Sequence, residues 1–242
     1  MLAYRNFVAV LLAVVMTAFA GCAARAFDVV TIPLDVNAVN LTAAMDIVPG
    51  SGGKVQLSTA PDADGIIRRI EVQATNPQTN PKWALFALRN TSDAQIERLL
   101  VAPFFRLPGS GMFNPDLGDN RITILTPSQG IRPERQPDAE ADVFDITLDP
   151  GATVTFIAEM SSDRLPEVYL WKPDAYRDFI NSFTLFRGTV LGVSGLAAVF
   201  LTIMFVVKGR GVFPVTAAVA WAVLFYCLID FGVFGRLLGI GN

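Results

Sequence analysis

Two long uncharged stretches near the carboxyl end dominate the hydrophobic pattern of the chain. Residues 188–207 contain no charged side chain, and after Lys208 and Arg210 the same holds for residues 211–229. A membrane-spanning helix needs about 20 predominantly apolar residues, at roughly 1.5 Å of rise per residue, to cross a hydrocarbon core of about 30 Å. The pattern therefore predicts a hairpin of two transmembrane helices, joined by a short basic turn.

The preceding segment, residues 27–172, consists of short apolar or alternating runs separated by Gly, Pro, Asn and Asp. Such runs are typical of β-strands bounded by turns. Pro-Gly pairs begin at Pro49, Pro108 and Pro150 and mark corners, because Pro fixes φ and Gly tolerates positive φ. The pattern favours an all-β, jelly-roll-like sandwich. We expect about eight strands, at residues 28–32, 54–57, 65–73, 82–90, 96–105, 121–125, 141–148 and 153–160.

Residues 1–26 are expected to be a signal peptide rather than part of the fold. A basic start at Arg5 is followed by an uncharged core and then by small residues, which is the layout of a secretory signal. Cleavage is expected near Gly21 or Phe27. Lipid attachment at Cys22 is the alternative, although two later spans make an acyl anchor unnecessary. The sandwich is therefore expected in the periplasm, attached to the inner membrane of a bacterium.

Between the sandwich and the first span, residues 173–187 carry apolar side chains at helical spacing. We predict a juxtamembrane helix here that continues into the membrane. Its aromatic side chains, Tyr176, Phe183 and Phe186, are expected at the membrane interface, where such rings are enriched. With the sandwich outside, the basic turn between the spans lies in the cytoplasm, and residues 230–242 form a short periplasmic tail.

Composition narrows the classes of function. The formal net charge is -3 and the basic residues are dispersed, so the chain has no basic face for nucleic acid. Histidine is absent, which removes the commonest general base and the usual zinc ligand. We expect no enzymatic activity and no cofactor. Carboxylates at Asp62, Asp64, Asp138, Glu140 and Asp142 lie in turn-like segments, where solvated loop charge is the favoured interpretation.

Four segments, taken in order, resemble the bacterial seven-transmembrane receptors with diverse intracellular signalling modules. Residues 34–46 look like the opening of the family's exported domain, and residues 83–92 like its tryptophan-led strand ending in Asn. Residues 148–156 are similar to its late turn and strand, and residues 170–173 to its exit toward the membrane. The resemblance implies a jelly-roll sensor domain, seven spans and an output such as a cyclic-di-GMP enzyme. Because only two spans and no output motif occur, we expect a truncated receptor or a short relative.

Exposed aromatic rings are the candidate ligand contacts, because sandwiches of this type resemble carbohydrate-binding modules. The candidates for binding a periplasmic ligand or protein partner are Phe113, Phe105 and Trp171. Phe113 is the first choice, since it lies in the Gly-rich and Pro-rich residues 106–120. Long loops are often functional, but this one and residues 127–138 are alternatively plain connections between strands.

Asp116 and Asp119 are weak candidates for a calcium site, because a hard cation binds several loop oxygens. Solvated loop charge is the favoured interpretation for these two residues as well, and no other metal site is expected.

Small residues at Gly188, Gly192 and Gly195 form a helix-packing pattern in the first span. Such residues allow two helices to approach closely, so a homo-oligomer contact through this span is one hypothesis. Two alternatives are that Gly is simply frequent in spans, or that this face packs on the second span of the same chain.

Taken together, the sequence predicts a non-catalytic, membrane-anchored ligand-binding module that acts as the input part of a transmembrane signalling protein. The alternative is an accessory or structural subunit, whose hairpin docks on a larger inner-membrane complex.

Overall fold

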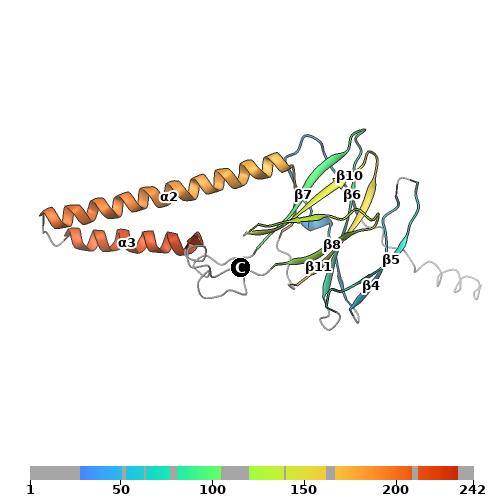
Figure 1. The fold of residues 1–242 in the computed structure, drawn as a ribbon, viewed down its shortest axis with the longest axis horizontal. Coiled ribbons are helices and arrows are strands. Elements are labelled where there is room, and N and C mark those ends of the chain that lie inside the picture. The colour runs from blue at the N-terminus through green and yellow to red at the C-terminus, as the bar shows by residue number, and fades with distance from the viewer. Residues whose placement is uncertain are drawn as a thin grey trace, which may run out of the picture.

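A computed structural model describes residues 28–50, 53–62, 64–76, 81–104, 120–138, 140–161, 167–208 and 212–233. It consists of a β-sandwich from which two helices extend side by side (Figure 1). The predicted fold class, an all-β sandwich followed by a two-helix hairpin, is confirmed.

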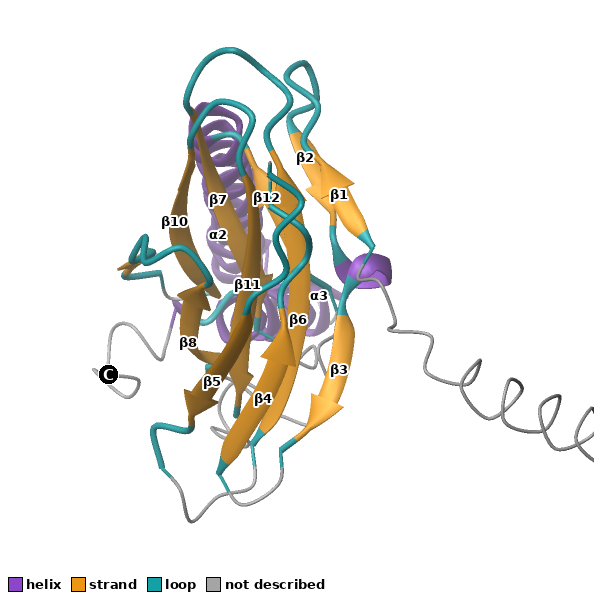
Figure 2. Ribbon diagram, turned by 90° about the vertical axis from the view of Figure 1, so that its right-hand side faces the viewer, coloured by secondary structure: helices purple, strands orange, loops and turns teal. Residues whose placement is uncertain are grey.

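Two five-stranded sheets form the sandwich, which Figure 2 shows from the side turned by 90°. In sheet A the order is β1-β6-β11-β8, and β3 pairs with the same edge of β6 as β1 but further along it. In sheet B the order is β2-β12-β7-β10-β9. The strands of sheet A are β1 Val29–Thr31, β3 Asp46–Pro49, β6 Lys82–Arg89, β8 Ile122–Pro127 and β11 Thr153–Met160. Those of sheet B are β2 Ala38–Asn40, β7 Ile96–Pro103, β9 Glu134–Gln136, β10 Ala141–Leu148 and β12 Tyr169–Trp171.

The main core lies between the two sheets and is built by alternate residues of the four long strands. Phe86 on β6 and Phe156 on β11 are fully buried and stack with their ring centroids 5.4 Å apart. Leu100 on β7 and Ile146 on β10 enter the same cluster from sheet B. Since successive side chains of a strand point to opposite faces, the residues between them form the outer faces of the sheets.

A separate hairpin covers the outer face of sheet A. It consists of β4 Lys54–Ser58 and β5 Arg69–Gln73, which pair only with each other among the described strands. Val55 and Val72 of this hairpin pack with Trp83, Leu85 and Ile157 of sheet A. Both outer faces of the sandwich are therefore partly covered, sheet A by this hairpin and sheet B by a helix.

Four short strands, β2, β3, β9 and β12, are absent from the sequence prediction. The prediction of a loop over residues 127–138 is wrong at β9, which pairs with β10 there. All three residues of β9 are exposed, so they give no alternation of apolar and polar side chains.

Two buried polar side chains close the ends of the sandwich. Asp142, whose side chain has no exposed surface, accepts hydrogen bonds from the backbone N–H groups of Arg121 (2.6 Å) and Ile122 (2.9 Å) and pairs with Arg135 at 2.5 Å. It thereby ties β10 of sheet B to the start of β8 in sheet A. The interpretation of Asp142 as solvated loop charge is wrong. This carboxylate lies within β10, is buried, and accepts hydrogen bonds from two backbone N–H groups at the start of β8.

Asn90, which follows β6, has a comparable role at another corner. Its amide nitrogen donates to the carbonyls of Ala94 (2.8 Å), Leu148 (3.1 Å) and Asp149 (3.0 Å). Its amide oxygen accepts from the N–H and hydroxyl of Ser92. Asn90 is only 1% exposed, so these bonds hold the β6–β7 and β10–β11 turns together in a site shielded from solvent.

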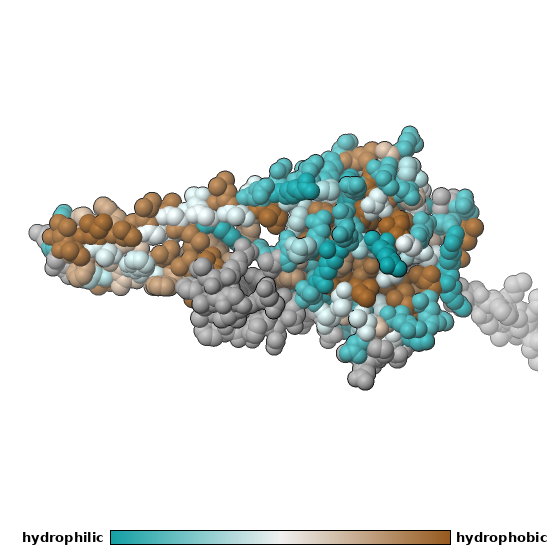
Figure 3. Space-filling model, viewed as in Figure 1, coloured by the Kyte–Doolittle hydropathy of each residue, from teal (hydrophilic) through white to brown (hydrophobic). Residues whose placement is uncertain are grey.

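The helices are α2 Pro173–Lys208 and α3 Val212–Asp230, of 36 and 19 residues. Each contains a stretch long and apolar enough to cross a membrane, and almost none of that apolar surface is buried within the protein. Figure 3 shows hydrophobic residues along both helices and polar residues over the sandwich and the base of α2. The helices contact each other at Ala198 and through Trp221, whose indole N–H donates to the Thr202 hydroxyl at 3.1 Å.

Candidate functional site

Helix α2 begins directly after β12, at the outer face of sheet B. The Lys172 N–H donates to the carbonyl of Asn37 (2.9 Å), and the Tyr176 N–H donates to the carbonyl of Lys172 (3.0 Å). Pro173 occupies the first helical position, where its missing N–H leaves no helical bond unmade and its fixed φ suits the helix. The helix is therefore attached to the sheet from its first turn.

Aromatic side chains pack the base of α2 on sheet B. The ring of Trp171 lies 6.0 Å from Tyr176 and 5.2 Å from Phe179, measured between centroids. Tyr176 is only 8% exposed and packs with Leu99, Val101, Ala141 and Val143 of the sheet. The expectation that Tyr176 lies at the membrane interface is therefore wrong, since its ring is buried against the sandwich. Trp171, a predicted ligand contact, is half-buried in this packing.

The polar contacts of α2 with the sandwich converge on the connection between β9 and β10. The Tyr176 hydroxyl donates to Oδ2 of Asp138 at 3.1 Å. The other carboxylate oxygen of Asp138 accepts the N–H groups of Glu140 (2.7 Å) and Ala141 (3.2 Å), which fixes its direction. Burial, and secondarily the nearby Asp138 and Glu140 carboxylates, raise the pKa of Tyr176. Tyr176 therefore stays protonated and remains a donor at any neutral pH.

The second polar contact lies about three turns further along α2. Arg187 forms an ion pair with Glu140, and both side chains are mostly shielded from solvent. The guanidinium also lies over the ring of Phe183, at 4.1 Å from its centroid, and 5.6 Å from that of Phe231 beyond the end of α3. Arg187 thus connects the sandwich to both helices. Glu140 and Asp138, interpreted from the sequence as solvated loop charge, are instead the partners of the helix.

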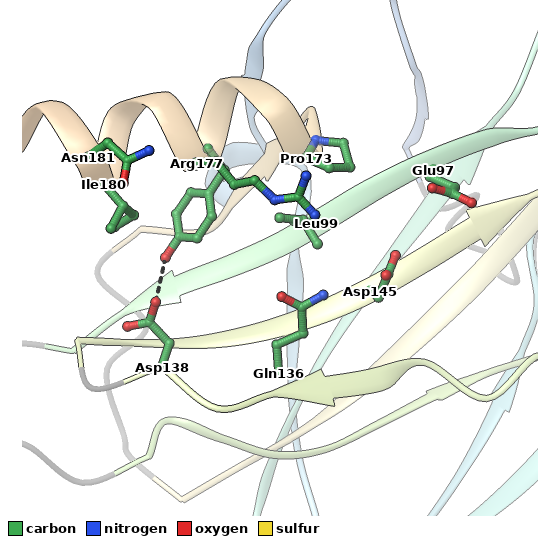
Figure 4. A pocket seen from close by; sticks show the side chains of 10 residues that line it. Glu97, Leu99, Gln136, Asp138, Asp145, Pro173, Arg177, Ile180 and Asn181 are labelled. Carbon is green, nitrogen blue, oxygen red and sulfur yellow. Dashed lines mark hydrogen bonds between the residues drawn. The ribbon is translucent and has the colours of Figure 1, made fainter.

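A cavity of about 360 Å³ lies between the outer face of sheet B and the first turns of α2 (Figure 4). Its walls combine carboxylates, amides and one guanidinium with a few apolar side chains. The sheet and the β9–β10 connection contribute Glu97, Leu99, Gln136, Asp138 and Asp145, and the helix contributes Pro173, Tyr176, Arg177, Ile180 and Asn181. We call the space lined by these ten residues the junction cavity. An occupant would contact the sandwich and the helix together.

Several predicted site residues lie outside the described residues: Phe105, Phe113, Asp116 and Asp119. Within the described part of the chain, no group of three or more acidic or cysteine side chains is arranged to hold a metal ion. The residues that build the junction were missed because its pairs are far apart in sequence, 38 positions for Tyr176 and Asp138 and 47 for Arg187 and Glu140. The helical spacing of Tyr176 was the one usable signal.

The glycine face of α2 is open in the structure. A Cβ atom added at Gly188, Gly192 or Gly195 meets nothing within 4 Å. Helix α3 packs instead along the neighbouring face that carries Ala198 and Thr202. Within the described residues, α3 therefore makes no close approach to the three glycines.

A family model described as 7TMR-DISM extracellular 2 matches residues 42–172, more than half of the chain. The chain belongs to this family. The match runs from the 3₁₀ turn before β3 to the last residue before α2, so it covers most of the sandwich. Searches of curated proteins and of solved structures each found no match.

Membership of this family shows what type of domain the sandwich is. The matched domain is an extracellular domain of a sensory, non-catalytic type, and two helices long enough to span a membrane follow it. The protein is therefore a membrane protein with an exported, sensor-type β-sandwich. The resemblance drawn from the sequence is confirmed.

Proposed function

We propose that the chain is the input part of a bacterial inner-membrane signalling protein, in which the periplasmic sandwich controls the position of α2. The supporting observation is that Tyr176 and Arg187, eleven residues apart on α2, both bind the connection between β9 and β10. A movement of that short connection therefore moves both of its contacts with α2, at Tyr176 and at Arg187. The partner that triggers the change is a periplasmic ligand or protein.

The junction cavity gives this proposal a physical basis. A ligand shifts a two-state equilibrium only by the difference between its affinities for the two states. Because the cavity has one wall on the sheet and the other on the helix, any movement of α2 alters the contacts of its occupant. Different affinities for the two helix positions follow from this geometry.

A link to cyclic-di-GMP, which the family resemblance implies for a longer parent protein, has no support in the described residues or in the family match.

Distance measurements between two spin labels test whether the sandwich controls α2. Labels would be placed at Thr123 on β8 and Val206 near the far end of α2, both exposed, in the full chain in nanodiscs with the native cysteines replaced by serine. The unmodified junction is expected to give one narrow distance distribution by double electron–electron resonance. Combining Glu140→Gln with Tyr176→Phe is expected to broaden the distribution and shift its mean, because both polar contacts of the helix are weakened.

Glu134→Gln is the matched control, since Glu134 is an exposed carboxylate on β9 outside the junction cavity. It should leave the distribution unchanged. An identical distribution in the double variant and the unmodified protein would contradict the proposal, and would be the result expected of a structural subunit with a passive anchor.

The open glycine face supports a second part of the proposal, a homo-oligomer formed through α2. Gly192→Leu is expected to reduce crosslinked dimer in membranes by about tenfold, because a large side chain separates the two helix backbones. Val193→Leu is the control, since Val193 is 63% exposed and already presents a branched side chain. Equal crosslinking of Gly192→Leu and the unmodified chain would refute packing through this face.

A further inference from the structure

We propose that the junction cavity binds a linear aliphatic polyamine, with one ammonium group at Asp145 and Glu97 and another toward Asp138. The inference rests on the proposed sensory function and names the class of ligand for it.

The first observation concerns the charge of the cavity wall. It carries three carboxylates, from Glu97, Asp138 and Asp145, and one guanidinium, from Arg177. Arg177 is itself paired with Asp174 at 3.4 Å, and both of these side chains are largely exposed, so its interactions are weak and solvated. The cavity is therefore net negative and selects a cationic occupant.

The second observation is an unpartnered carboxylate oxygen. Oδ1 of Asp145 is shielded from solvent and has no hydrogen-bond partner in the structure. Asp145 pairs with Leu99 across β7 and with Glu134 across β9, so no cation faces it from a neighbouring strand. A buried carboxylate oxygen without a partner is costly, and an ammonium group in the cavity would supply the missing donor.

The third observation is the spacing of the carboxylates. Glu97 opposes Thr147, two residues along β10 from Asp145, so Glu97 and Asp145 are diagonal neighbours on one face of the sheet. Asp138 lies at the other end of the cavity, beyond Gln136 (Figure 4). Because the carboxylates are spread along the cavity, and no described group of three is arranged for a metal ion, a single metal cation fits the site poorly.

The apolar part of the wall completes the match to a polyamine. Leu99 on the sheet and Pro173 on the helix line the cavity between its charged ends, and Ile180 lines it at the end near Asp138 (Figure 4). Methylene groups of a short diamine or triamine would pack on these side chains while the ammonium groups meet carboxylates. At Asp138 an ammonium competes with the Tyr176 hydroxyl, which couples binding to the contact that holds α2.

Isothermal titration calorimetry on the full chain, in nanodiscs of zwitterionic lipid, tests the inference with putrescine, spermidine and hexylamine. We expect saturable binding of at least one polyamine with one site per chain. Hexylamine, with a single ammonium group, should bind at least about tenfold more weakly, as should the polyamine to Asp145→Asn, since each lacks one charged contact. Glu97→Gln provides a second variant, and Asp64→Asn, an exposed carboxylate between β4 and β5 and outside the cavity, should bind like the unmodified chain. Thermal melts of each variant establish that it is folded.

Absence of saturable heat would overturn the inference. So would folded Asp145→Asn and Glu97→Gln variants that bind the polyamine with the same affinity as the unmodified chain. Competition by an equal concentration of magnesium chloride would do the same, because it indicates unspecific charge attraction.

The same titrations followed by the spin-label distance separate the two proposals. No polyamine binding, together with a helix that moves in the double junction variant, removes only the ligand class. Binding that leaves the helix distance unchanged supports the ligand class and counts against the sensory function.

Discussion

Replacing Asp142 with asparagine is expected to destabilise the sandwich by about 3 kcal/mol, because the change disrupts a buried charged hydrogen-bond centre. The carboxylate accepts two backbone N–H groups at the start of β8 and binds Arg135, with none of its own surface exposed. An asparagine can offer its single oxygen to the N–H groups, but its NH₂ group then faces the guanidinium. For a domain of this size we expect the melting temperature to fall by roughly 10 °C.

Tryptophan fluorescence of the detergent-solubilised chain during heating measures this effect. Asp149→Asn is the matched control, because Asp149 is an exposed carboxylate whose side chain accepts one bond from Gln95 at 2.9 Å. Its stability should stay within about 0.5 kcal/mol of the unmodified chain. If Asp142→Asn melts as the control does, Asp142 does not hold the two sheets together.

A second large effect is expected from Asn90→Asp, again about 3 kcal/mol of lost stability. The new carboxylate keeps an acceptor for Ser92. Its second oxygen, however, places negative charge against the three carbonyl oxygens that accept hydrogens from the Asn90 amide in the unmodified protein. Asn90 is 1% exposed, so water cannot compensate the repulsion. Urea unfolding followed by circular dichroism measures the loss.

Ser92→Ala is the partner variant, because it removes only the hydroxyl that donates to Asn90 at 2.7 Å. The same hydroxyl also lies 2.9 Å from the carbonyl oxygen of Ala94, and because it has only one hydrogen to donate, we expect a loss of about 1 kcal/mol. Equal stabilities for Asn90→Asp and Ser92→Ala would show that the amide nitrogen of Asn90 contributes nothing at this corner.

The fold was predictable where burial makes the sequence pattern strong. The strands β6, β7, β10 and β11 each have eight residues and are largely buried, so long apolar runs mark them. The two helices follow from uncharged stretches of membrane-spanning length. Strands of three or four residues, such as β9 and β12, depend on pairing with a long neighbour, and a local pattern does not reveal such pairing.

The junction was much less predictable, because its charges look like ordinary loop charges in the sequence. Asp138 and Glu140 belong to a polar segment, and only the return of α2 across sheet B brings Tyr176 and Arg187 to them. Asp145 stands in an apparently ordinary alternating strand, and its unpartnered oxygen becomes evident only when β7, β9 and α2 are placed around it. Tertiary contact, rather than local sequence, defines this site.

The helix α2 runs without a break from the sheet to its far end, and this continuity makes it a rigid lever. Its 36 residues correspond to about 54 Å, and the part beyond Arg187 to about 32 Å. If Arg187 serves as the pivot, a rotation of about 5° at the base displaces the far end by roughly 3 Å. Small rearrangements at Asp138 are therefore magnified across the bilayer without any hinge inside it.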